Sequence, residues 1–185
     1  MALPAEVLNL IKLIDKEDHE TVNTVSSPNK MRLGEMFLYV YSPKFKDDKK
    51  VLPYYDTLPL IILLGKGGDR MLGINVHYIP WTWRVKLVRD MMKAVGGGHR
   101  VRYRDIKNAI KSAKIPSAIM YYALRTYLYG HIRSEVKNFD SQNFELALQN
   151  VMPKFQRKTD TYIYKEMLSK LYKKTGGIRK KKKSK

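Results

Sequence analysis

The stretch LPLIILL at residues 58–64, followed by GKGGD at 65–69 and MLGINVHY at 71–78, decides the fold. Two short apolar runs separated by a glycine-rich segment are typical of two strands joined by a hairpin turn. Pro59 lies near the start of the first run, where a missing N–H is tolerated. The sequence therefore predicts a buried antiparallel pair of strands.

Further elements are predicted on both sides of this pair. The aromatic-rich run MFLYVY at 36–41 reads as a strand, and the alternation along 131–139 is compatible with a fourth. Apolar residues at helical spacing predict helices at 4–18, 81–94, 103–114, 117–129, 141–150 and 160–172. We therefore expect an α+β fold: a small antiparallel sheet or barrel-like core of three to four strands, packed with four to five helices.

The predicted domain organisation has four parts. Residues 1–20 form an N-terminal amphipathic docking helix, 21–35 a linker, 36–172 the α+β core and 173–185 a disordered basic tail. The tail holds eight basic residues and no acidic one, and its self-repelling lysines favour disorder. No apolar run is long enough to span a bilayer, so we expect no membrane partner.

The charge of the chain is an argument about its partners. Its 185 residues carry 36 Lys and Arg against 17 Asp and Glu, a formal net charge of +19. Such an excess indicates a polyanionic partner, with nucleic acid favoured over an acidic membrane surface. The charge alone fits DNA, RNA or an acidic protein.

Within the part of the chain that is predicted to fold, much of the positive charge lies between residues 84 and 114. Ten basic residues there are opposed only by Asp90 and Asp105. Within the helix predicted at 103–114, basic residues recur at spacings of three and four. That spacing places them on one helical face, opposite an apolar face that includes Ile106 and Ile110. The face consists of Arg104, Lys107, Lys111 and Lys114.

Several kinds of chemistry are disfavoured. The chain has no cysteine, which excludes disulfides, cysteine nucleophiles, iron–sulfur clusters and the usual zinc sites. None of the four histidines stands in a metal-binding motif, and His77 reads as a hydrogen-bonded core histidine rather than a catalytic one. The glycine-rich segments at 65–68 and 96–98 lack the context of nucleotide-binding loops. We expect no metal, no cofactor and no catalytic residue.

A nuclease is the enzyme class that the acidic residues leave conceivable. Asp47, Asp48, Asp56 and Asp69 lie near predicted strands, where carboxylates could hold magnesium. The Asp…(Asp/Glu)-x-Lys pattern does not follow, so a nuclease is disfavoured.

Four segments together resemble a known family. They are MFLYVYSPK at 36–44, LPYYDTLPL at 52–60, LGINVHYIP at 72–80 and LRTYLYGH at 124–131. The combination resembles virion structural proteins of T-even-type tailed bacteriophages in the DNA end protector family, over roughly residues 34–155. A baseplate or tail-completion protein is the close rival.

The resemblance implies a non-enzymatic virion protein, present in the host cytoplasm during assembly. Its expected role is to bind the end of packaged double-stranded DNA near the head–tail junction without sequence specificity, and to protect that end from exonucleases. The alternative is a baseplate wedge or tail assembly subunit whose basic surface contacts other phage structural proteins. The expected nucleic-acid-binding residues are Arg89, Lys93, Arg100, Arg102, Arg104, Lys107, Lys111, Lys114, Lys180, Lys181, Lys182 and Lys183.

Overall fold

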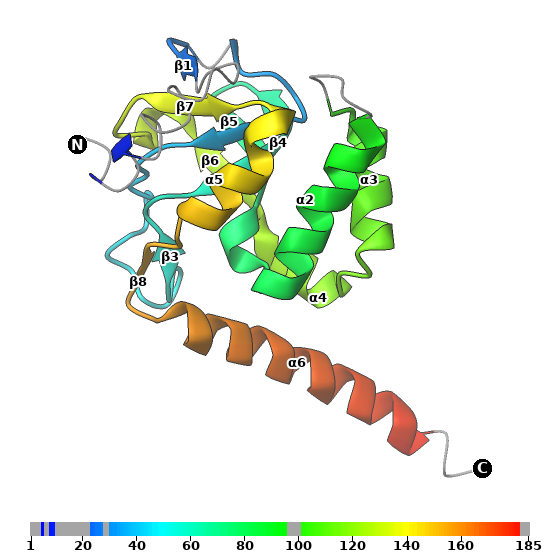
Figure 1. Cartoon of the computed structure of the whole chain (residues 1–185). Helices are drawn as coiled ribbons and strands as arrows, with labels where there is room; N and C mark the ends of the chain where they lie inside the picture. The colour runs from blue at the N-terminus through cyan, green and yellow to red at the C-terminus, as the bar shows by residue number, and fades with distance from the viewer. Residues whose placement is uncertain (1–4, 6–7, 10–22, 28–29, 96–100, 182–185) are drawn as a thin grey trace.

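An antiparallel sheet with helices packed against one of its faces forms the body of the molecule (Figure 1). This computed structural model describes residues 5, 8–9, 23–27, 30–95 and 101–181, of which 23 and 171–181 are described by their backbone only. The α+β class predicted from the sequence is confirmed. The sheet is larger than expected: six strands, with a separate two-stranded sheet.

The strands are β1 (Asn23–Val25), β2 (Met36–Leu38), β3 (Tyr55–Asp56), β4 (Leu60–Gly67), β5 (Arg70–Asn75), β6 (Leu124–Leu128), β7 (Val136–Phe139) and β8 (Phe155–Gln156). The helices are α2 (Trp81–Val95), α3 (Tyr103–Ser112), α4 (Ser117–Ala123), α5 (Phe144–Asn150) and α6 (Asp160–Lys181). Short 3-10 helices are η2 (Val76–Tyr78), η3 (Tyr129–His131) and η4 (Ser141–Asn143).

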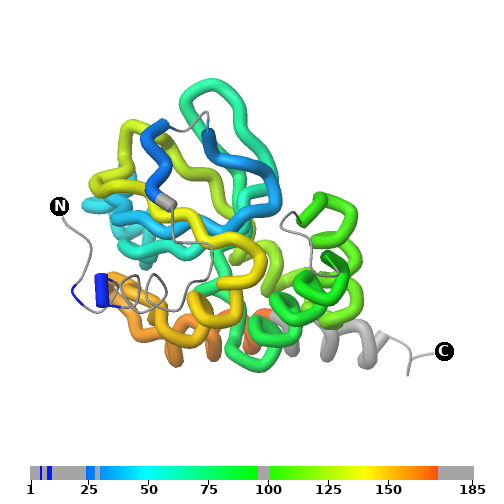
Figure 2. The backbone as a smooth tube through the Cα atoms, turned by 45° about the horizontal axis from the view of Figure 1, so that its top comes forward, coloured from blue at the N-terminus to red at the C-terminus, as the bar shows by residue number. Residues whose placement is uncertain are grey.

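The large sheet has the order β1-β7-β2-β4-β5-β6, and every pairing in it is antiparallel. The predicted hairpin is its centre, since β4 pairs with β5 on one side and with β2 on the other. Strand β1 pairs with β7, which is distant from it in the sequence, and Figure 2 shows these two segments side by side. The small sheet pairs β3 with β8.

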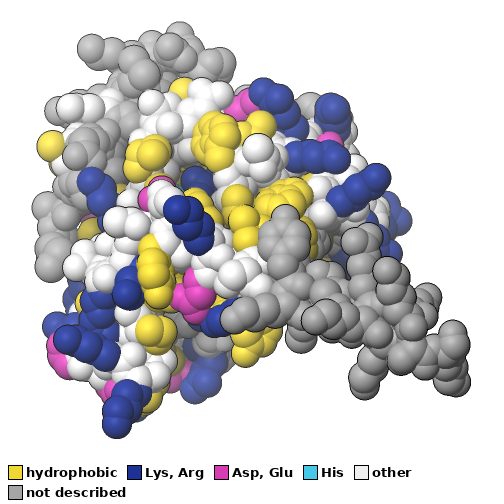
Figure 3. All heavy atoms as spheres, turned by 90° about the horizontal axis from the view of Figure 1, so that it is seen from below, with side chains coloured by type: hydrophobic (Ala, Val, Ile, Leu, Met, Phe, Trp, Pro, Cys, Tyr) yellow, Lys and Arg dark blue, Asp and Glu magenta, His cyan; other side chains and the backbone are white. Residues whose placement is uncertain are grey.

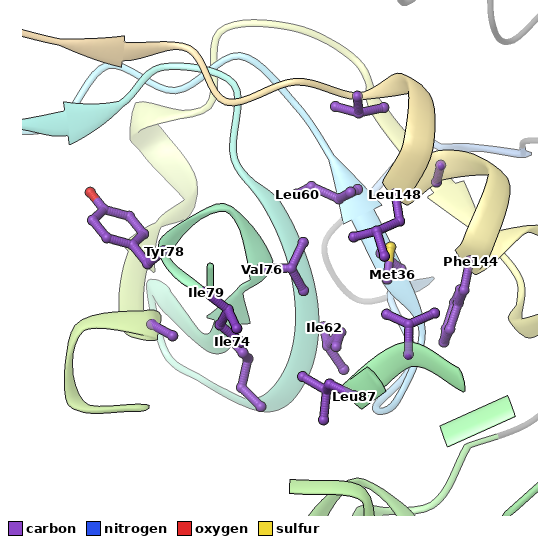
Figure 4. Close-up of a cluster of buried hydrophobic side chains, with 14 of the residues drawn as sticks. Met36, Leu60, Ile62, Ile74, Val76, Tyr78, Ile79, Leu87, Phe144 and Leu148 are labelled. Atoms are coloured by element: carbon purple, nitrogen blue, oxygen red, sulfur yellow. The ribbon is translucent and has the colours of Figure 1, made fainter. Parts of the chain in front are cut away.

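Both faces of the central strands are buried where β4 begins, which explains why its first five residues, 60–64, are an unbroken apolar run. Side chains such as Leu60 and Ile62 point to the helices and join a cluster with Leu87 of α2 and Phe144 of α5 (Figure 4). Their neighbours point to the other face, where Ile61 belongs to a second cluster rich in tyrosine. Because successive side chains in a strand alternate, one sequence supplies both layers.

The segment 117–129 differs from its prediction as one continuous helix. Helix α4 ends at Ala123, and residues 124–128 form strand β6, which pairs with β5. In the strand, Tyr127 is buried and its hydroxyl accepts a hydrogen bond from Asn75. The backbone hydrogen bonds that this segment makes with β5 outweigh its local preference for a helix. Its secondary structure is therefore set by tertiary pairing.

Other boundaries shift in smaller ways. Residues 23–25 lie within the expected linker but form β1, because β7 presents an open edge to them. The strand predicted over 71–78 ends at Asn75, whose side chain accepts a hydrogen bond from the backbone N–H of His77 and begins η2. The helix predicted at 4–18 lies outside the described residues, apart from Ala5, Leu8 and Asn9. The expected helix stop at 96–98 lies outside them too.

Gly34 brings the segment before β2 into contact with Val101, two residues before α3. Its φ is +87°, and a Cβ added there would lie 1.9 Å from the carbonyl oxygen of Val101. Only glycine fits such a left-handed position with a backbone in contact. Val101 is itself buried, so this contact anchors the chain at the start of α3.

Candidate nucleic-acid interface

Helix α3 presents three cations to solvent along one face, and a fourth, Lys114, is exposed just after the helix, which ends at Ser112 and not at 114 as predicted. Arg104, Lys107, Lys111 and Lys114, which we call the α3 stripe, are all exposed. Ile106 and Ala109 on the opposite face are buried in the core. The apolar contacts of one face therefore fix the direction of the charged face.

Both ends of α3 are held by backbone contacts. At the start, the carboxylate of Asp105 accepts a hydrogen bond from the backbone N–H of Arg102 at 3.0 Å, so this acidic side chain is turned toward the backbone. At the end, Lys114 has a φ of +52° and its N–H donates to the carbonyl of Lys111 at 3.0 Å. A residue in the left-handed conformation just after a helix is a common C-terminal cap, although glycine is usual there. The last cation of the stripe thus also ends the helix.

On α2, the cations Arg89 and Lys93 lie on a face that does not adjoin the α3 stripe. Arg89 is exposed and its Nε lies 2.9 Å from Oε1 of Glu145 on α5, so its charge is partly neutralised. Lys93 is also exposed and, one turn along, shares the face of Arg89. The structure therefore does not bring Arg89 to the α3 stripe. Figure 3 shows Lys and Arg side chains on the side of the molecule where α2 and α3 lie, with hydrophobic side chains beside them, and a second group of Lys and Arg side chains on the opposite side.

One residue of the basic segment 84–114 does not reach the surface. Arg84 is buried, and it donates hydrogen bonds to the carbonyl oxygens of Ile79 and His77 and to the hydroxyl of Tyr164 on α6. Burial lowers the pKa of its guanidinium from the usual value, against the favourable effect of Tyr164. Arg84 therefore ties α6 to η2 rather than serving an external anion.

The remaining predicted cations are only partly described. Arg102 is exposed. Arg100, Lys182 and Lys183 lie outside the described residues, and Lys180 and Lys181 fall in the part of α6 that is described by backbone alone.

His77 is a core histidine, and its partner is a carboxylate that the sequence did not assign to it. Its Nδ1 lies 2.7 Å from Oδ2 of Asp56, and its Nε2 lies 3.1 Å from the carbonyl oxygen of Val151. Both ring nitrogens thus face oxygen atoms that accept hydrogen bonds, so the ring is held between Asp56 and Val151. Burial raises the pKa of Asp56, but the charge of His77 and hydrogen bonds from His77 and Asn75 outweigh it and lower that pKa overall.

The four aspartates considered for a nuclease do not gather. Asp56 is engaged with His77, Asp69 pairs with Arg70, and Asp48 accepts hydrogen bonds from two backbone N–H groups of its own loop. Within the described ranges, no group of three or more metal-ligating side chains is placed to hold an ion.

An apolar groove beside the stripe was missed by the sequence analysis. It has a volume of about 460 Å³ and lies between α3, α4 and the strands β4, β5 and β6 of the large sheet. In the sequence, Tyr103 could have indicated this groove, because it is a large aromatic residue at the start of a cationic helix. We call this surface the apolar groove; its lining residues are Leu64, Leu72, Ile74, Tyr103, Ile106, Lys107, Ile110, Met120 and Leu124.

Among the comparisons with known proteins, a family model matches most of the chain. The family model described as phage T4 terminal DNA protecting protein matches residues 14–171, a longer stretch than the resemblance covered. No curated protein and no solved structure matches the chain. Among the described helices, none combines the length and apolar character needed to cross a membrane. The chain therefore belongs to the family of the phage T4 terminal DNA protecting protein, a family of structural protectors and not of enzymes.

Proposed function

We propose that this chain is a phage virion protein that binds the end of packaged double-stranded DNA near the head–tail junction and shields it from exonucleases. The family name, which describes terminal DNA protection, supports the substrate. The observation that carries the proposal is the α3 stripe: three of its cations are exposed on one face of a helix fixed by its apolar side, and Lys114 is exposed just after that helix.

Phosphate contact is the proposed mechanism. Cations at successive turns of α3 neutralise backbone phosphates and release condensed counterions, which requires no base readout. Arg102 extends the row at the start of the helix, whereas Arg89 and Lys93 lie together on another face of α2 and are left out of the row. Arg100 and the lysines at 180–183 belong to this proposal on the strength of the sequence alone, the latter as an arm that follows the backbone. Protection results from occlusion of the end and needs no active site.

Salt dependence tests the DNA-binding part. Four phosphate contacts predict that affinity for a linear duplex falls roughly 100-fold between about 50 and 200 mM salt. A virion subunit that uses its basic surface on protein neighbours, the baseplate or tail assembly alternative, would show weak duplex binding with a shallow slope. A flat salt dependence would thus reject the proposal in favour of that alternative.

Digestion by an exonuclease tests the protective part. The full chain should slow degradation of a linear duplex by an enzyme that starts at ends, at protein concentrations that leave an endonuclease acting on a circular duplex unaffected. Equal inhibition of both nucleases would mean that the protein coats DNA generally, and the end-specific role would be wrong.

A further inference from the structure

Phosphate contacts leave one question open, namely how a protein distinguishes a duplex end from the duplex interior. The backbone of both carries the same charges, so cations alone favour neither. An end differs because the last base pair exposes one flat aromatic face that is covered everywhere else by stacking. A protein that prefers ends therefore needs an apolar surface next to its cations.

The apolar groove meets this requirement. Tyr103 is 62% exposed, Leu124 is 43% exposed and Leu72 is 37% exposed, although all three are large apolar side chains. Leu72 points to the helix-covered face of the sheet together with Ile74, at a place that α3 and α4 leave open. Exposed apolar surface concentrated in this way usually marks a binding site.

The charge around the groove defines its occupant. Lys107 belongs to both the α3 stripe and the groove lining, and Arg104 and Arg102 flank Tyr103 in the chain. This arrangement fits a ligand with an apolar surface that is flanked by negative charges. The end of a duplex has that chemistry, because it exposes an aromatic face bordered by two phosphate backbones. An apolar segment of a protein partner would gain nothing from these three cations.

We infer that the apolar groove stacks against the terminal base pair of duplex DNA, with Tyr103 as the aromatic platform and Arg102, Arg104 and Lys107 on the adjoining phosphates. The inference rests on the proposed function and adds the feature that makes binding specific for ends. Aromatic side chains stack on bases without regard to sequence, which suits a protein that must accept any terminus.

The experiment compares two DNA molecules with one stem sequence. The first is a linear duplex with two free ends, and the second is a dumbbell whose ends are closed by hairpin loops. Binding of the full chain to each is measured at one salt concentration. The unmodified protein should prefer the linear duplex, and Tyr103→Ala should reduce that preference by at least about 5-fold while leaving dumbbell affinity unchanged. Tyr103→Phe retains the ring and should retain the preference.

Matched controls separate this inference from the proposed function. Phe45→Ala removes another aromatic side chain, 53% exposed and outside the groove, and should change neither affinity. Lys107→Gln should weaken binding to both DNA molecules. Equal binding of linear and dumbbell DNA by the unmodified protein, or an equal loss on both with Tyr103→Ala, overturns stacking while phosphate binding stands. Absence of salt-dependent binding to either molecule overturns the proposed function itself.

Discussion

Neutralising two lysines of the α3 stripe should weaken duplex binding by an amount that the counterion model specifies. The variant is Lys107→Gln with Lys111→Gln. Both side chains are exposed on α3, one turn apart, and neither pairs with another described residue. Because the core contacts of α3 come from its opposite face, the free energy of unfolding should change by less than about 0.5 kcal/mol.

The magnitude follows from the number of phosphate contacts removed. Each contact contributes about 0.9 to the slope of log affinity against log salt concentration, so losing two should reduce the slope by about 1.8. At about 0.1 M salt the same two contacts correspond to a loss of roughly 60-fold in affinity. A solvated lysine that touches no phosphate would leave both quantities unchanged.

Fluorescence anisotropy of a labelled linear duplex, titrated at several salt concentrations, measures both quantities. The control is Lys49→Gln with Lys50→Gln, which removes the same net charge from two exposed residues in the loop after β2. Figure 1 places that loop and α3 on opposite sides of the fold. If the two variants lose affinity equally, net charge and not the stripe drives binding, and the reasoning above is refuted.

Three further predictions concern stability and its separation from binding. Gly68 has a φ of +55° and open space around it, so Gly68→Ala should lower the free energy of unfolding by about 1–2 kcal/mol. Gly34→Ala should lower it further, because the added Cβ would clash with the backbone of Val101. Equal losses for the two variants in urea unfolding would contradict this. Asp56 has a lowered pKa in the fold, so the stability it contributes is present above its unfolded pKa near 4 and is lost as pH falls through the folded value. The stability difference between the natural chain and Asp56→Asn should therefore stay constant above about pH 5 and shrink as the pH falls below about 4. A difference that stays constant into that acid range would count against the ion pair with His77. Lys114→Gly removes left-handed strain and should raise the unfolding free energy by up to about 1 kcal/mol, yet weaken duplex binding roughly 8-fold at about 0.1 M salt; loss of stability would show that the lysine side chain supports the fold.

The sequence predicts those parts of the fold whose pattern is local. The hairpin of β4 and β5 follows from two apolar runs around a glycine-rich turn, and α2 and α3 follow from helical spacing. Strands β1 and β6 were missed because each exists only through a partner strand, β7 in one case and β5 in the other. Local propensity carries no information about such an open edge.

The candidate site divides in the same way. Helical spacing predicts the exposed face of α3, since burial of Ile106 on one side requires exposure on the other. It does not predict that Arg84 turns inward, because that depends on the carbonyls of η2 and on Tyr164, which lies far along the chain. The lining of the apolar groove likewise comes from five separate elements, β4, β5, α3, α4 and β6, so no single segment of the sequence predicts it.

The sheet order has a consequence for how the chain acquires its fold. Strand β2 lies between β4 and β7, and the register pairs Asn23 of β1 with Asn138 of β7. During synthesis, the strands β2, β4, β5 and β6 can pair as soon as they emerge, but the outer edge of β2 stays open until β7 has been made. Met36, Phe37 and Leu38 are all buried in the finished sheet, so this edge is apolar on both faces. A chain that stops before residue 136 should therefore expose a strand edge that invites pairing with another copy, and it should aggregate rather than fold.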